Sequence, residues 1–464
     1  MSKIYVADII MGGGKTSGAI TYMLQNPDKK YIYIAPFLNE AERIANACGP
    51  LHFALPKQIS EYNRSKILHI EQLVKEDRNI ACSHVAFSAL TRQTIELINE
   101  KRYTLICDET VDAVKVDSVY VKDMLLLEKA GMLRREDDAY KFTGDDDYID
   151  GNSLYTDLCR LSRNNNVYFE DETLPSGKKE QYFYLLLPPE IFECFETVII
   201  LTYMFESSNL KSLLDLYGCD YEYIGIERVD FGNTYILSKT GLYVPEYIYD
   251  LKNKINIYEY DTNPIIGRGR PPKNLNKYRV KKGRLWEEKD FKPTMTFFRH
   301  PEKYSDLYNE LKNNQLSFFE KVIKQFGGTK NDCMWGTYKI AASKLEGRGL
   351  RKKFVPFNSK ATNEYRTKKY VSYICDLHLS PQLTRFFKKH NIGYDEKAWA
   401  LSTMLQFIWR SQCRDGKEIQ IYIPSFRMRN MLTSYLDDLS KGIVHASADK
   451  IATSADGPEL SPRS

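Results

Sequence analysis

The amino-acid sequence lacks the cysteine spacing of a metal site or a disulfide framework. Its nine cysteines are scattered along 464 residues and include no Cys-x-x-Cys pair, which argues against a structural zinc site and against a disulfide-stapled secreted domain. An apolar run of the roughly 20 residues that span a bilayer is also missing. The N-terminus enters a predicted strand at once, without a signal-peptide pattern. These absences predict a cytoplasmic protein.

A strong charge bias is missing as well. The sequence has 66 Lys and Arg against 61 Asp and Glu, a formal net charge of +5. This total neither requires nor excludes a nucleic-acid partner. A hydrophobic content of 43% and a charged content of 27% are typical of folded domains. Because 464 residues exceed what one hydrophobic core usually organises, the length predicts two domains.

Short apolar runs alternate with helical patterns along most of the chain. This alternation predicts an α/β fold, with parallel sheets covered by helices on both faces. In the first half, the predicted helices are 15–25 and 38–47, and the predicted strands are 4–10, 31–35, 80–87, 103–107 and 198–201. In the second half we predict strands at 333–338 and 419–423 and helices at 316–326, 367–379 and 396–409.

Changes in composition indicate the domain boundaries. A charged, turn-rich stretch over about 130–185 interrupts the alternation in the first half, and we interpret it as an insertion. We expect a first domain over 1–240 and a second over 241–435. The tail, 436–464, is expected to be disordered because it carries too little apolar surface to offset the entropy of ordering.

A glycine run follows the first predicted strand and opens the first helix. It reads Gly12-Gly13-Gly14-Lys15-Thr16. Glycines let backbone N–H groups close around phosphate oxygens, and the helix N-terminus adds positive dipole character. The lysine would bind the outer phosphates of ATP, and the threonine hydroxyl would ligate Mg²⁺. The full G-x-x-x-x-G-K-[ST] pattern is not met, since Ile9 stands at its first glycine.

Two acidic residues, Asp108 and Glu109, follow the predicted strand 103–107. In open α/β sheets, ligands bind at the carboxyl ends of the strands. Asp108 would hold Mg²⁺, and Glu109 would orient and deprotonate the attacking water. A lone acidic pair after a strand is usually a solvated loop, but together with the phosphate loop it predicts an ATP site.

The order of these motifs resembles that of superfamily-two (DEAD/DEAH-like) helicases, especially compact helicase-like ATPases of bacteriophages. Residues 11–16 resemble motif I, 34–38 motif Ia, and the Asp-Glu-Thr-Val run at 108–111 motif II. The resemblance implies two RecA-like P-loop domains in tandem with an insertion in the first. It also implies a cytoplasmic location in the host cell if a phage encodes the chain.

The same resemblance assigns nucleic-acid contacts to the first domain. Ser83 and His84 fall in the later part of the motif Ia region, where they could meet phosphates. Thr202 matches motif III, but Tyr203 replaces its small alanine, so the coupling role of that motif is open.

In the second half, residues 354–366 resemble the motif V region, with Thr362 and Asn363 as the candidate nucleic-acid contacts. Gln406, Arg410 and Arg414 resemble motif VI, where an arginine reaches the γ-phosphate of ATP. Glycine is replaced by tryptophan before Arg410, and the second arginine comes one residue late. Either arginine could therefore be the one that contacts the phosphate.

Two basic segments indicate phosphate contacts. Residues 267–284 contain no acidic residue, and Arg268 and Arg270 within them resemble the core of an AT-hook, which binds a narrow minor groove. Residues 339–369 overlap the motif V region and are also rich in Lys and Arg. Such contacts give sequence-independent, salt-sensitive binding.

These patterns together predict an ATPase that uses ATP and Mg²⁺ to translocate along or unwind nucleic acid, with DNA favoured over RNA. Two alternatives share the same ATP chemistry. A packaging motor of the large-terminase kind would add a nuclease centre of clustered carboxylates. A non-motor switch would bind a partner protein and hydrolyse ATP independently of nucleic acid.

Overall fold

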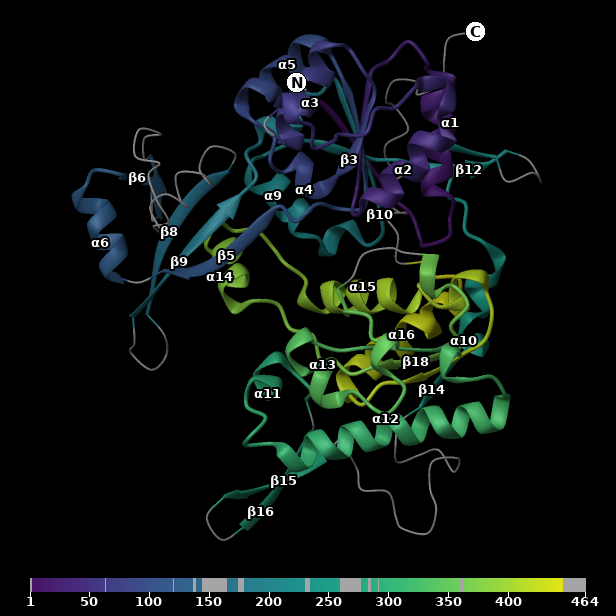
Figure 1. Ribbon diagram of the computed structural model, residues 1–464. Coiled ribbons are helices and arrows are strands. Elements are labelled where there is room, and N and C mark those ends of the chain that lie inside the picture. Colours follow the sequence, from purple (N-terminus) through teal and green to yellow (C-terminus); the bar gives the residue numbers. More distant parts are fainter. Residues whose placement is uncertain are drawn as a thin grey trace.

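The computed structural model contains two α/β domains, one above the other in Figure 1, with a smaller sheet projecting from the upper one. It describes residues 2–444 except 63, 120, 137–138, 144–164, 174–178, 230–233, 259–276, 283–284, 291 and 359–362. The expected tail beyond 444 lies outside the described residues. No helix in the described part of the chain is long and apolar enough to cross a membrane.

The first domain is built on six parallel strands. Their spatial order is β11 (Tyr221–Tyr223), β1 (Lys3–Asp8), β10 (Thr197–Thr202), β4 (Thr104–Asp108), β2 (Tyr31–Ala35) and β3 (Ile80–Ser83). Every residue of β2 and β4 is buried, as expected where helices cover both faces of a parallel sheet. Strands β1 and β4 are separated by β10 alone, so the glycine run and the acidic pair emerge at one edge.

The helices of this domain follow its strands. They are α1 (Lys15–Gln25), α2 (Leu38–Ala47), α3 (Lys66–Lys75), α4 (His84–Phe87), α5 (Arg92–Lys101), α8 (Glu190–Glu193) and α9 (Asn209–Leu216). The prediction of one strand over 80–87 was wrong in its second half. Strand β3 ends at Ser83 because the Ser83 side chain accepts a hydrogen bond from the Ala86 amide and caps α4.

An antiparallel sheet interrupts the first domain between β4 and β10. Its order is β5-β9-β8-β7-β6, formed by β5 (Val114–Val119), β6 (Leu133–Glu136), β7 (Ala139–Phe142), β8 (Asn166–Thr173) and β9 (Lys179–Leu186), with α6 (Val121–Lys129) after β5. The sheet thus begins at Val114, ahead of the expected start near 130, because the whole of β5 pairs with residues 181–186 of β9. In Figure 1 it extends to one side of the molecule.

A short hairpin links the domains. Strands β12 (Gly225–Arg228) and β13 (Tyr235–Ser238) pair in antiparallel fashion and pack against α1. After it come the 3-10 helix η5 (Glu246–Asp250) and α10 (Leu251–Lys254).

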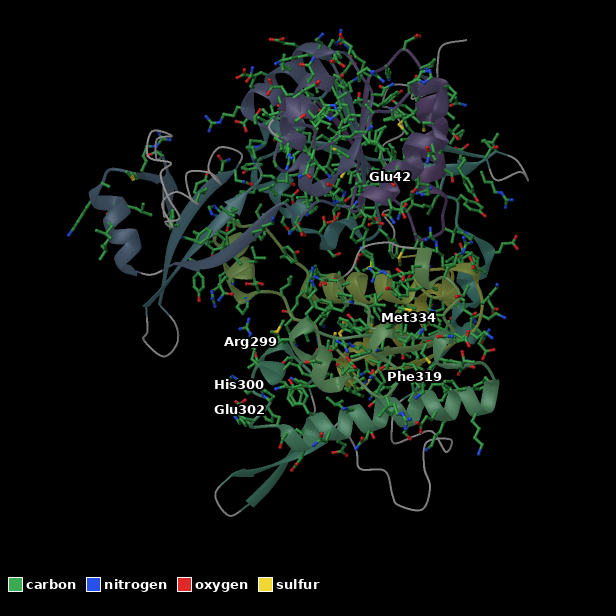
Figure 2. The ribbon with its side chains drawn as sticks, in the orientation of Figure 1. Glu42, Arg299, His300, Glu302, Phe319 and Met334 are labelled. Carbon is green, nitrogen blue, oxygen red and sulfur yellow. The ribbon has the colours of Figure 1, made fainter. Side chains whose placement is uncertain are left out.

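The second domain holds four parallel strands in the order β14 (Ile255–Tyr258), β19 (Ile419–Tyr422), β18 (Tyr370–Tyr373) and β17 (Cys333–Gly336). Its remaining helices are α11 (Met295–Arg299), α12 (Ser305–Phe326), α13 (Lys339–Leu345), α14 (Pro381–Lys389), α15 (Glu396–Ile408) and α16 (Phe426–Ser440), and a hairpin joins β15 (Lys277–Lys282) to β16 (Leu285–Asp290). Phe319 of α12 and Met334 of β17 belong to the core of this domain (Figure 2). The predicted end of the domain at 435 falls inside α16, which runs on to Ser440.

The predicted helix over 367–379 was wrong, because β18 occupies the middle of that range. All four of its residues are buried between β17 and β19. Tyr370, Val371 and Tyr373 are residue types that fit a half-buried pleated surface. With this strand, both domains have the parallel α/β architecture expected of RecA-like domains in tandem.

The two domains are joined by buried contacts at two places. Ile10, Tyr203 and Met204 of the first domain pack into the core of the second, where the Tyr203 hydroxyl lies 2.8 Å from that of Tyr435 on α16. At the second place, helix α14 reaches back to the first domain. Its Phe386 ring stacks on Tyr184 of β9 with centroids 4.5 Å apart, and Phe387 is buried in the first-domain core.

Candidate active site

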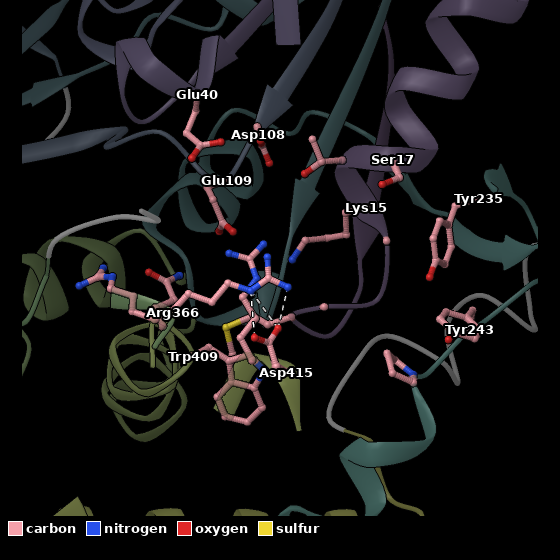
Figure 3. Close-up of a pocket in the computed structure, with 18 of the residues that line it drawn as sticks. Lys15, Ser17, Glu40, Asp108, Glu109, Tyr235, Tyr243, Arg366, Trp409 and Asp415 are labelled. Carbon is pink, nitrogen blue, oxygen red and sulfur yellow. Dashed lines mark hydrogen bonds and ion pairs between the residues drawn. The ribbon is translucent and has the colours of Figure 1, made fainter. Parts of the chain in front are cut away.

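A cleft of about 840 Å³ lies where the carboxyl edge of the first sheet meets the second domain. One wall comes from the glycine run and the end of β4. The facing wall comes from the end of α15 and the turn after it, and the third side from residues 243–247 and the linking hairpin. Figure 3 shows Lys15, Asp108 and Glu109 on one side and Arg366, Trp409 and Asp415 on the other.

The glycine run makes a tight turn that only glycine adopts without strain. Gly12 and Gly14 have φ of 84° and 89°, in the left-handed region. The Gly13 amide donates to the Ile10 carbonyl at 3.0 Å. Helix α1 then begins at Lys15 without a side-chain cap. An uncapped helix N-terminus that follows a glycine turn suits a phosphate group.

Lys15 extends from the first residue of α1 into the cleft (Figure 3). Its side chain is largely buried, with the residue 8% exposed, and its Nζ donates to the Ile9 carbonyl at 3.1 Å. A buried ammonium with one neutral partner keeps two further N–H groups for an anion. The Ile9 carbonyl, which a glycine at this position would also provide, therefore positions the lysine.

Asp108 ends β4, and its Oδ2 accepts a hydrogen bond of 2.7 Å from the Tyr33 hydroxyl. Burial raises the pKa of the Asp108 carboxyl to about 6, and the neighbouring Glu109 charge adds to the rise, while the Tyr33 hydrogen bond and the Lys15 charge oppose it. Because burial disfavours the charged form of this carboxyl group, a cation bound beside it would stabilise the carboxylate.

Glu109 is held in an uncommon backbone conformation. Its φ is 63°, in the left-handed region, and its amide donates to the Leu201 carbonyl of β10 at 2.8 Å. Such a conformation in a residue other than glycine is sparsely populated and persists where the surroundings enforce it. The turn directs the Glu109 side chain toward the middle of the cleft (Figure 3).

Thr16 and Asp108 both line the cleft and offer a hydroxyl and a carboxylate oxygen. Mg²⁺ is usually bound through one or two protein oxygens together with water and substrate phosphates. No group of three or more His, Cys, Asp or Glu side chains with metal-site geometry occurs among the described residues. The donor set therefore fits Mg²⁺ bound together with a nucleotide.

Arg410 follows α15 and lines the cleft from the second domain. The residue is 3% exposed, and none of its three guanidinium nitrogens has a hydrogen-bond partner among the described residues. Burial lowers the pKa of Arg410 to about 10, and the neighbouring Tyr365, Tyr373 and Glu109 partly offset this. A buried cation without an acceptor is costly, and an anion in the cleft would supply one.

The other two motif VI residues also line the cleft, but differently. Arg414 is exposed, and its carbonyl accepts a 3.0 Å hydrogen bond from the Tyr247 hydroxyl. Gln406 is half-buried on α15. Of the two candidate arginines, the buried Arg410 therefore has the stronger requirement for an anionic partner.

The predicted nucleic-acid contacts of the first domain lie at, or directly after, the carboxyl ends of β3 and β10. Ser83 caps α4, a ring nitrogen of His84 lies 2.9 Å from the Asp108 carbonyl, and the carbonyl of the buried Thr202 accepts from the Ile9 amide. The His84 and Thr202 bonds join the ends of different strands, and contact with nucleic acid stays a prediction. Arg268, Arg270 and Thr362 lie outside the described residues, as does the side chain of Asn363, which opens the 3-10 helix η8 (Asn363–Tyr365).

The cleft also contains Arg43, which lies outside the motifs, and Arg366, which ends the motif V region but had no predicted role. Arg43 of α2 donates to Glu40 at 2.9 Å, and its charge acts on Asp108. Arg366 donates to both carboxylate oxygens of Asp415. The position of Arg43 on the helix after motif Ia is a weak signal that could have indicated it. The Arg366–Asp415 pair depends on tertiary contact and leaves no local pattern.

A family model and a relative of this chain both identify the same family. Residues 249–436 match the family model described as the YonV C-terminal Rossmann-like domain. The SPbeta prophage-derived uncharacterized protein YonV of Bacillus subtilis (strain 168) is 30% identical over 450 residues, which cover 94% of this chain and 100% of that protein. The structure of S. tokodaii Xpd4 matches with a TM-score of 0.42 and 11% identity over 96% of this chain and 94% of that one, too distant to support any functional argument. The chain belongs to the YonV family.

Proposed function

We propose that the protein is an ATPase that hydrolyses ATP in the cleft between its two α/β domains and uses the cycle to translocate along nucleic acid, as a helicase-type motor does. The observation that carries this proposal is Arg410, a buried guanidinium without a hydrogen-bonding acceptor among the described residues, which lines the same cleft as Lys15 and Glu109. A γ-phosphate between them is the anion that satisfies both cations.

In this mechanism the glycine run and the N-terminus of α1 bind the phosphates, and Lys15 exchanges the Ile9 carbonyl for a phosphate oxygen. Mg²⁺, held by Thr16 and Asp108, would neutralise charge on the phosphate oxygens. Glu109 orients the attacking water and accepts its proton, and Arg410 stabilises the charge on the transferred phosphoryl group. Because Arg410 comes from the second domain, loss of the γ-phosphate removes a bond between the domains and favours opening of the cleft.

Support for a nucleic-acid partner comes from basic residues that gather beside β17 and β18. Lys330 donates to the Arg348 carbonyl at 2.7 Å, and Lys353 and Lys368 donate to Asn331 at 2.7 and 2.5 Å. Arg351 and Lys352 between these segments are exposed. A convergent basic surface of this kind suits phosphate contacts that do not depend on sequence.

The phosphate loop and the acidic pair are tested by two substitutions in the full chain. Lys15→Ala should lose both ATP binding and turnover, because it removes the cation at the phosphates. Glu109→Gln should bind ATP with near-parental affinity but lose turnover, because the amide cannot accept the proton of water. Phosphate release and nucleotide binding measure the two effects. Parental turnover by Lys15→Ala would contradict the assignment.

The role of Arg410 is tested by Arg410→Met, with Arg414→Met as the matched control. Turnover should fall by roughly 10³-fold or more, whereas ADP affinity should stay unchanged because the guanidinium faces the γ-phosphate. In the absence of nucleotide, thermal unfolding should show the Arg410 variant to be at least as stable as the parent, because a buried unpaired charge has been removed. If Arg414→Met lost turnover and Arg410→Met did not, the two roles would be reversed.

The nucleic-acid partner is tested by ATPase rates with single-stranded DNA, duplex DNA, forked DNA and RNA. We expect stimulation that falls steeply with salt. Replacing Arg351 and Lys352 with Gln should weaken stimulation and leave the basal rate unchanged. The slope of log binding constant against log salt concentration should decrease by about one unit for each lost phosphate contact. Lys3→Gln, an exposed residue at the start of β1, is the control. A rate indifferent to every nucleic acid would favour the non-motor switch, and metal-dependent DNA cleavage would favour a packaging-type motor.

A further inference from the structure

One side of the cleft is lined by aromatic residues that have no role in the proposed hydrolysis. Tyr235 and Tyr243 lie beyond Lys15 and Ser17, on the opposite side of the cleft from Glu109 and Arg366 (Figure 3). Both tyrosines are partly exposed. The cleft therefore has a charged end at the acidic pair and an aromatic end at the two tyrosines, with the phosphate loop between them.

The linking hairpin builds this aromatic side. Arg228 of β12 and Tyr235 of β13 are directly opposite each other in the antiparallel register, so their side chains share one face. The Tyr243 amide donates to the Ile226 carbonyl of β12 at 2.8 Å, which adds Tyr243 beside the same strand. The Tyr235 and Tyr243 rings are 5.4 Å apart and inclined at 58°. The Arg228 guanidinium lies 5.8 Å from the centre of the Tyr243 ring.

The aromatic side is built directly against the phosphate loop. A Cβ atom on Gly14 would lie 2.5 Å from the Tyr235 ring, and one on Gly12 would lie 2.5 Å from the Tyr247 hydroxyl. The rings therefore begin where the glycine run ends. A planar group joined through a sugar to phosphates on the loop would lie next to them.

We propose that Tyr235, Tyr243 and Arg228 form the subsite for the base of the nucleotide, which they bind by stacking, so that purine nucleoside triphosphates are preferred over pyrimidine ones. This inference rests on the proposed function, since it assumes that phosphates bind at the glycine run. Stacking on tyrosine faces with an adjacent guanidinium favours a large aromatic surface and requires no particular pattern of donors at its edge. ATP and GTP should therefore bind similarly, and CTP more weakly.

The test uses the full chain carrying Glu109→Gln, so that binding is measured without hydrolysis. Dissociation constants are determined by calorimetry for ATP, GTP, CTP and inorganic tripolyphosphate with Mg²⁺. ATP and GTP should bind more tightly than CTP, and all three more tightly than tripolyphosphate. Adding Tyr243→Ala should weaken ATP binding by about 5- to 100-fold and leave tripolyphosphate binding unchanged. Tyr243→Phe, which keeps the ring, should bind ATP like the parent.

The outcomes separate the inference from the proposed function. If tripolyphosphate bound as tightly as ATP, or if Tyr243→Ala weakened the two equally or not at all, the base subsite would be wrong while the phosphate site stood. If neither ATP nor tripolyphosphate bound, both proposals would fail. The comparison of ATP, CTP and tripolyphosphate on the chain with intact Tyr243 decides the matter even if Tyr243→Ala does not fold.

Discussion

The site depends on a positive charge buried without a hydrogen-bonding acceptor among the described residues. The guanidinium of Arg410 lies at the boundary of two domains, and burial alone lowers its pKa. On the opposite wall, burial raises the pKa of the Asp108 carboxyl. Both groups are destabilised in their charged forms, and both would be relieved by one ligand that carries phosphate oxygens and a divalent cation. These two buried charges thus destabilise the folded protein, and a bound nucleotide would stabilise it again.

The contacts between the domains explain why Arg410 can remain buried. Tyr203 occupies the position of a small alanine in motif III of the helicases that the sequence resembles. The structure shows why a large residue fits here. Its ring enters the core of the second domain, and its hydroxyl meets that of Tyr435. Helix α14 makes a second attachment through Phe386 and Phe387. With buried attachments at two places, relative motion of the domains is constrained, and changes at the γ-phosphate act on a defined interface.

The sequence allowed prediction of those parts of the site that depend on local pattern. A few neighbouring residues are enough to predict glycines with a left-handed φ, a lysine at a helix start, or acidic residues at a strand end. The structure brings these residues to one cleft. The choice between Arg410 and Arg414 could not be made, because it depends on burial between domains. Tyr235 and Tyr243 gave no signal among 33 tyrosines. Strand β18 was mistaken for a helix because its pairing on both sides outweighs a local pattern over 367–379.

In the proposed site, the γ-phosphate of ATP is the missing hydrogen-bond partner of Arg410. The most direct measurement is a crystal structure of the protein with Mg²⁺ and a non-hydrolysable ATP analogue. We expect phosphates on residues 12–16 and hydrogen bonds from the Arg410 guanidinium to the γ-phosphate. An analogue bound elsewhere, or one in the cleft whose γ-phosphate leaves Arg410 without a partner, would contradict it.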